Sequence, residues 1–124
     1  MEQLTPAQVN RGRLIEVAMT RKKVELKLTP SQFESLDRLM IQYLSFTPLM
    51  DINDKAVYFI VHSLWEKKIR PRHLDIKPTF KLNLDIAQAD ALVTMLYRVD
   101  IAEHLIYELN LRRTITAEIN HQTA

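Results

Sequence analysis

Two pairs of side chains have the types and the spacing of metal ligands. His62 and Glu66 are four residues apart, and so are His104 and Glu108. Residues four apart lie on one face of a helix, so each pair could supply an imidazole and a carboxylate to one ion. Helix-surface pairing explains each pair equally well, and the two pairs do not occupy equivalent positions of the internal repeat in this chain. We therefore expect no metal site.

The chain offers little else for catalysis. It has no cysteine, which excludes a thiolate nucleophile, a disulfide scaffold and a thiolate metal site. Gly12 is the only glycine, whereas phosphate-binding loops and nucleophile elbows need several. Asp37 is expected on a solvated helix face, and no base accompanies the serines, which are Ser31, Ser35, Ser45 and Ser63. We expect a protein that is not an enzyme and holds no cofactor.

An internal repeat predicts the elements that would position any binding residues. Residues 24–40 and 80–96 follow one pattern at an offset of 56, in which apolar residues alternate and then take helical spacing. Strict alternation is typical of a half-buried strand, and the later spacing is typical of an amphipathic helix. The matched residues are Leu26 with Leu82, Leu28 with Leu84, Gln32 with Gln88, and Leu36 with Leu92.

Capping signals separate these elements. Two predicted capping boxes, Thr29 with Gln32 and Asp85 with Gln88, begin the first helix of each repeat. Second helices are expected from Asp51 to about Ile69, and from a capping box of Asp100 with Glu103 towards Ile119.

The predicted fold is a helix-rich α+β domain spanning residues 1–124. It contains two β-α-α repeats, at about 24–69 and 80–119, and an N-terminal helix at about 6–20. Two short strands cannot stand alone. We therefore expect them to pair as an antiparallel ribbon, with their leucines packed on a helical bundle.

The predicted helix from Asp51 has apolar residues on most of its faces. Its expected core stripe contains Ala56, Val57, Ile60, Val61 and Leu64. Beside that stripe lie Tyr58, Phe59 and Trp65, which need cover from elsewhere. Such a helix is either central to the bundle or partly exposed at a contact, and the N-terminal helix or a second copy of the chain could cover the aromatics. Because the apolar face of the N-terminal helix is narrow, we expect a homodimer with Phe59 or Trp65 in its interface and take all three aromatics as candidate interface residues.

A strand followed by two helices, with the strands paired two-fold, resembles the ribbon–helix–helix DNA-binding family. The stretch TRKKVELKLTPSQFESLDRLM carries the resemblance, and each repeat would be one half of a fused pseudo-dimer. In that family the outward strand residues read bases in the major groove. By resemblance, the residues that contact nucleic acid would be Glu25, Lys27, Thr29, Lys81 and Asn83.

Charge and composition favour a different primary interpretation. Seventeen basic and 15 acidic side chains leave a formal net charge of only +2, which gives little long-range attraction for nucleic acid. The family's Gly-containing turn is absent, and the second helices begin with carboxylates where phosphate would bind. Two local basic clusters, at 21–23 and 67–73, are read as solvated helix ends or phosphate contacts.

We therefore interpret the chain first as a protein-interaction or regulatory module of unknown partner, and second as a fused ribbon–helix–helix DNA-binding protein. A polar start and a longest apolar run of only six residues, 56–61, predict a cytoplasmic protein without a membrane span. The outer face of the ribbon separates the two interpretations. A face that is open and positively charged favours DNA, and a face covered by the N-terminal helix favours protein binding.

Overall fold

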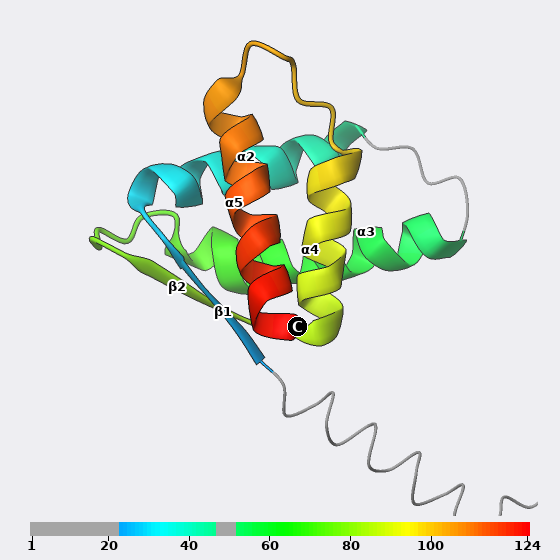
Figure 1. The fold of residues 1–124 in the computed structure, drawn as a ribbon, viewed down its shortest axis with the longest axis horizontal. Coiled ribbons are helices and arrows are strands. Elements are labelled where there is room, and N and C mark those ends of the chain that lie inside the picture. Colours follow the sequence, from blue (N-terminus) through cyan, green and yellow to red (C-terminus); the bar gives the residue numbers. More distant parts are fainter. Residues whose placement is uncertain (1–22, 47–51) are drawn as a thin grey trace, which may run out of the picture.

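The structure is a computed structural model that describes residues 23–46 and 52–124. The chain is helix-rich, with a two-stranded antiparallel sheet, as the α+β prediction requires (Figure 1). The expected N-terminal helix at 6–20 and the expected cap at Asp51 lie outside the described residues.

The two strands are β1, Lys23–Leu28, and β2, Phe80–Asp85. They pair antiparallel, and Leu26 lies opposite Leu82 near the middle of the ribbon. These two leucines are also 56 residues apart, which is the offset of the predicted repeat, so residues related by that offset lie at two-fold related positions of the register. The other partners are Lys23 with Asp85, Val24 with Leu84, Glu25 with Asn83, Lys27 with Lys81, and Leu28 with Phe80.

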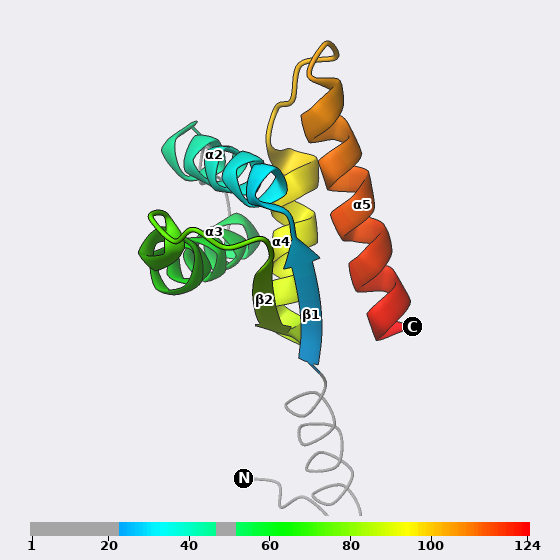
Figure 2. The same cartoon turned by 90° about the vertical axis from the view of Figure 1, so that its left-hand side faces the viewer.

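Alternation along each strand divides the ribbon into an apolar and a polar face. The apolar residues are all buried, as predicted from the sequence, and they join the core formed by the helices. The helices are α2, Pro30–Phe46; α3, Ile52–Leu64; α4, Ile86–Arg98; and α5, Ile106–Thr123. Helix α4 lies behind the ribbon, and α5 lies beside β1 (Figure 2).

Both predicted capping boxes at the first helices are confirmed. The backbone N–H of Gln32 donates to Thr29 Oγ1 at 3.2 Å, and the backbone N–H of Thr29 donates to Gln32 Oε1 at 2.9 Å. At α4 the corresponding distances are 2.7 Å, from Gln88 N to Asp85 Oδ1, and 3.1 Å, from Asp85 N to Gln88 Oε1. Each box satisfies two backbone donors and ends a strand directly at a helix.

The prediction of a capping box at Asp100 and Glu103 is wrong. Helix α5 begins at Ile106, and its N-cap, Leu105, has no side-chain cap. Asp100 lies in the loop before this helix, where its carbonyl accepts a hydrogen bond from the Gln42 side chain on α2 at 2.8 Å. The helix also runs further than expected, to Thr123.

Helix α3 carries two apolar stripes. Val61 and Leu64 are buried, as expected, but the placement of Ala56 in the core stripe is wrong, since this residue is exposed. Ile52, Ala56 and Phe59 are spaced four and three residues apart, so they share the solvent face. The helical path continues as a π-helical turn, Trp65–Ile69, and a 3₁₀ turn, Arg70–Arg72.

Within the described part of the chain, no helix is both long and apolar enough to cross a lipid bilayer.

Candidate nucleic-acid interface

The outer face of the ribbon is polar, and no other part of residues 23–46 and 52–124 covers it. Three lysines, one glutamate and one asparagine are exposed there, namely Lys23, Lys27, Lys81, Glu25 and Asn83. Figure 2 looks onto this face, and no other described element lies in front of the strands. Four of the five residues that the family resemblance indicated therefore share one accessible surface, and Asp85 at its end is only partly exposed.

Two of these lysines face each other. Lys27 lies directly opposite Lys81 in the register, and like charges at directly opposed positions destabilise a β-ribbon. The Glu25 carboxylate lies diagonally, with Oε1 3.8 Å from Lys81 Nζ. Since one carboxylate faces two ammonium groups, this end of the face keeps an excess of positive charge.

Two more cations line the outer edge of β2. Lys68 Nζ donates to the carbonyl oxygen of Asn83, and an Arg72 guanidinium N–H donates to that of Lys81. Both side chains belong to the basic cluster at 67–73, and both turns that carry them follow α3. These contacts satisfy edge carbonyls of β2 and place two positive charges beside the open face.

The environment of Lys68 changes its proton affinity. Partial burial lowers the pKa of the Lys68 ammonium, and the nearby charges of Lys23 and Arg72 add to this effect, while Asp85 opposes it. The ammonium also lies 3.4 Å from Gln88 Oε1. Lys68 therefore loses its proton more readily than a solvated lysine, and an anion beside it would favour its charged form.

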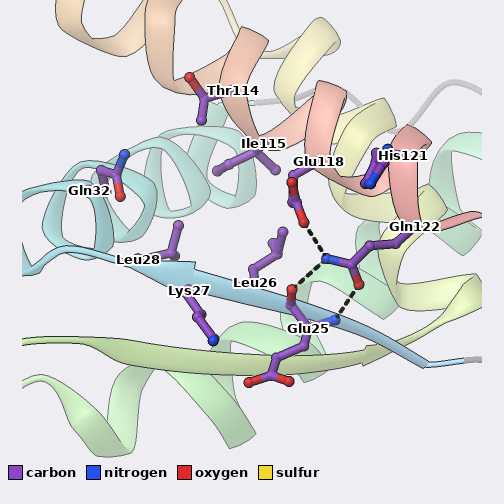
Figure 3. Close-up of a pocket in the computed structure, with 10 residues that line it drawn as sticks. All are labelled: Glu25, Leu26, Lys27, Leu28, Gln32, Thr114, Ile115, Glu118, His121 and Gln122. Carbon is purple, nitrogen blue, oxygen red and sulfur yellow. Dashed lines mark hydrogen bonds between the residues drawn. The ribbon is translucent and has the colours of Figure 1, made fainter.

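A neutral side chain covers the outer edge of β1, in contrast to the two cations on the edge of β2. The Gln122 side chain on α5 accepts from the Glu25 N–H at 2.9 Å and donates to the Glu25 carbonyl at 2.7 Å (Figure 3). Gln122 also donates to the Glu118 carboxylate at 2.6 Å. A cavity of about 650 Å³ between β1 and α5 continues past Lys27 towards Gln32. The carboxamide thus takes the place that a neighbouring peptide group would have on this edge.

Thr29 is the fifth residue indicated by the resemblance. It follows the end of β1, and its hydroxyl accepts the Gln32 N–H in the capping box. This contact holds Thr29 at the start of α2, so its first role is in the fold.

The expected interface residues Tyr58, Phe59 and Trp65 differ in exposure. Tyr58 is partly buried, and its hydroxyl donates to the Leu44 carbonyl at 2.9 Å. Trp65 packs against the core and donates its indole N–H to Asp37 at 2.7 Å. Phe59, which is 62% exposed, packs edge-on against Tyr58. The exposed stripe of α3 therefore includes Phe59 but neither of the other two aromatics.

The expectation that Asp37 is solvated is wrong. Only 7% of this residue is exposed, because Trp65 covers it and donates to Oδ1. Its other oxygen lies 3.8 Å from His73 Nδ1. A cavity of about 370 Å³ beside this carboxylate is also lined by Ile41, Arg70 and Leu74. Asp37 ties α2 to the turns that carry Lys68 and Arg72.

The two proposed metal pairs are not brought together into a site. His62 Nδ1 lies 4.0 Å from Glu66, and Glu66 lies 3.8 Å from Arg70 on the same helical path. Over residues 23–46 and 52–124, no group of three or more candidate ligands is arranged to hold a metal ion.

Gln122 and Asp37 are the structurally important polar residues that the sequence did not indicate. Their partners lie 97 and 28 residues away in the chain. No local spacing could have identified either contact.

Comparison with known proteins gives no further constraint on this surface. No protein-family model, curated protein or solved structure matches the chain.

Proposed function

We propose that this protein binds double-stranded DNA through the outer face of the β1–β2 ribbon and that it is not an enzyme. The observation that carries the proposal is the directly opposed pair Lys27 and Lys81, both of them exposed on a face that no other described element covers. Such a pair costs stability in the free protein, and an anionic partner lying between the two ammonium groups would offset that cost.

The dimensions of the ribbon support this mode of binding. Neighbouring strands lie about 4.8 Å apart, and the major groove of B-DNA, about 12 Å wide, admits a two-stranded ribbon. Outward side chains would then meet base edges. Lysine can donate to the O6 and N7 acceptors of guanine, asparagine can pair with adenine, and a glutamate can accept from the cytosine amino group.

The edge cations would act on the phosphates. Lys68 and Arg72 are fixed at β2 by their contacts with strand carbonyls, so they need little ordering when DNA arrives. Together with the three lysines of the face they give five cations. If all five contact phosphates, the plot of log binding constant against log salt concentration has a slope of about −4.5 at its steepest. Binding of modest salt dependence is therefore expected.

The two β-α-α units also support the proposal, and we propose that they arose by duplication of one unit. Their first helices begin with the same capping box, and equivalent leucines pair at the centre of the ribbon. A single chain would then supply the complete ribbon that the ribbon–helix–helix family builds from two chains. The sequence alone ranked protein binding first, and the opposed, exposed lysines of the outer face lead us to place DNA binding first.

The test compares the wild-type chain with a Lys27→Ala, Lys81→Ala double variant on a duplex library at two salt concentrations. We expect sequence-selective binding by the wild type and a loss of affinity of at least about tenfold in the double variant. Lys55→Glu is the matched control, because it removes the same amount of charge from α3 and should bind nearly as well. Equal losses in both proteins, or no binding by the wild type, would refute the proposal.

A second function is supported by the exposed stripe of α3. Ile52, Ala56 and Phe59 form an apolar surface on one helix face, and Ile52 and Phe59 are 81% and 62% exposed. Exposed apolar stripes commonly mark protein interfaces. We propose a second copy of the chain as the partner, consistent with the homodimer expected from the sequence.

A further inference from the structure

The two halves of the ribbon are related by position but differ in chemistry. At the repeat offset of 56, Glu25 corresponds to Lys81, and Lys27 corresponds to Asn83. A two-fold rotation about the central leucine pair therefore exchanges a carboxylate with an ammonium group, and an ammonium group with a carboxamide. The apolar inner face keeps the symmetry that the outer face lacks.

The antiparallel register collects the positive charge at one end. Lys27 and Lys81 are partners, and Arg72 donates to the Lys81 carbonyl beside them. At the other end Lys23 lies opposite Asp85, and Lys68 adds one positive charge through its contact with the Asn83 carbonyl, so the excess of positive charge there is smaller. The outer face is consequently polarised along the length of the ribbon.

The two edges differ in the same way. Lys68 and Arg72 line β2, whereas the β1 edge is covered by the neutral carboxamide of Gln122 with Glu118 behind it. Phosphates approaching the two edges would meet different charges. The charges on the outer face and along its two edges therefore lack two-fold symmetry.

We infer, on the basis of the proposed function, that one chain reads a short non-palindromic DNA sequence in a single orientation. Palindromic operators mirror proteins whose reading elements are related by two-fold symmetry, and this outer face has no such symmetry. Since lysine prefers the guanine acceptors and asparagine prefers adenine, guanines should gather at the Lys27–Lys81 end of the target.

The test is selection from duplexes whose random stretch is about eight base pairs. This length is less than the helical turn of about 10 base pairs that separates two half-sites, so only one ribbon can read it. The wild-type chain should enrich a sequence without internal two-fold symmetry. An inverted repeat, or binding without enrichment, would overturn the inference and leave DNA binding itself intact, whereas absence of binding would overturn both.

A symmetrised variant provides the converse test. Glu25→Lys with Lys27→Asn gives β1 the same two outward residues as β2, and its selected sequence should become an inverted repeat. Thermal unfolding followed by circular dichroism checks that this variant folds. A selected sequence as asymmetric as that of the wild type would show that these residues do not set the polarity.

A second measurement does not require changes in the reading face. The chain has no cysteine, so Ser31→Cys, exposed in the first turn of α2 after β1, can carry a DNA-cleaving reagent. On the selected site we expect cuts on one side only. Equal cutting on both sides would mean that the chain binds in both orientations and would overturn the inference.

Discussion

Lys27 and Lys81 lie opposite each other with a single carboxylate, that of Glu25, beside them. A pair of like charges at this position weakens a two-stranded ribbon. If the ribbon binds DNA as proposed, the same pair attracts phosphate and guanine groups. Stability of the free protein and affinity for DNA should therefore change in opposite directions when one lysine is removed.

The first prediction follows from this opposition. Lys27→Thr should raise the free energy of unfolding by about 0.2–1 kcal/mol, through relief of repulsion and higher strand propensity, and should weaken DNA binding. Urea titration and duplex titration measure the two quantities. Lys23→Thr is the control. It gains the same strand propensity but loses the attraction between Lys23 and Asp85, so its stability should rise less than that of Lys27→Thr. A Lys27→Thr protein less stable than the wild type would show that the two lysines do not repel each other.

The second prediction concerns the opposite face of the same strand. Leu26 is 2% exposed at the centre of the ribbon, so Leu26→Ala should lower the free energy of unfolding by about 2–5 kcal/mol. Asn83→Ala on the outer face should change it by less than about 0.5 kcal/mol. An effect of Leu26→Ala below about 0.5 kcal/mol in a urea titration would mean that this side chain is not buried in the core.

At the scale of elements, each ribbon edge is held by a different part of the chain. The turns after α3 supply Lys68 and Arg72 to β2, and α5 supplies Gln122 to β1. Such contacts cover strand edges that would otherwise pair with other chains. On β2 they also position charge beside the outer face.

The third prediction uses the lowered pKa of Lys68. A neighbouring phosphate would raise the pKa of Lys68 in the complex. Above the pKa that Lys68 has in the free protein, the side chain must therefore take up a proton when DNA binds. Affinity for DNA should be flat at neutral pH and fall as the pH rises towards the ordinary lysine value of about 10.4. Duplex titrations from neutral to alkaline pH measure this. Lys68→Arg, whose side chain stays charged, should show a smaller fall, and identical profiles would exclude Lys68 from the interface.

The fourth prediction concerns α3. Its exposed stripe of Ile52, Ala56 and Phe59 should form the interface of a homodimer, because burying a phenylalanine contributes roughly 1.5–3 kcal/mol. Light scattering over a concentration series should give a dimer for the wild type and a monomer for Phe59→Glu. Tyr107→Glu, at another exposed aromatic, should stay dimeric. A wild-type monomer at high micromolar concentration would exclude the interface.

Elements whose signals are local were predicted well from the sequence. The capping boxes at Thr29 and Asp85 join residues three apart, and strand alternation is visible within six residues. Asp100 with Glu103 has the same spacing, yet α5 begins only at Ile106, and the Asp100 carbonyl accepts a hydrogen bond from Gln42, 58 residues away. Tertiary contacts of this kind also explain why the candidate site was seen only in part, since Lys68 and Arg72 reach β2 through the fold.

At the scale of the whole molecule, the ribbon joins the core to the proposed binding surface. Its inner face belongs to the core that the helices share, and its outer residues are exposed among the described parts of the chain. Any ligand of the outer face would leave the core undisturbed. A folded chain should therefore bind without large rearrangement, and its contacts can be mapped on the protein as it stands.

Protection of individual lysines by DNA would locate the binding surface. The full chain is acylated at low salt with and without saturating mixed-sequence duplex, and the rate at each lysine is read by mass spectrometry. If the ribbon is the binding surface, DNA should slow the reaction at Lys27 and Lys81 by several-fold and leave Lys55 on α3 unchanged. Unchanged rates at both ribbon lysines, with DNA bound, would show that DNA binds elsewhere on the protein.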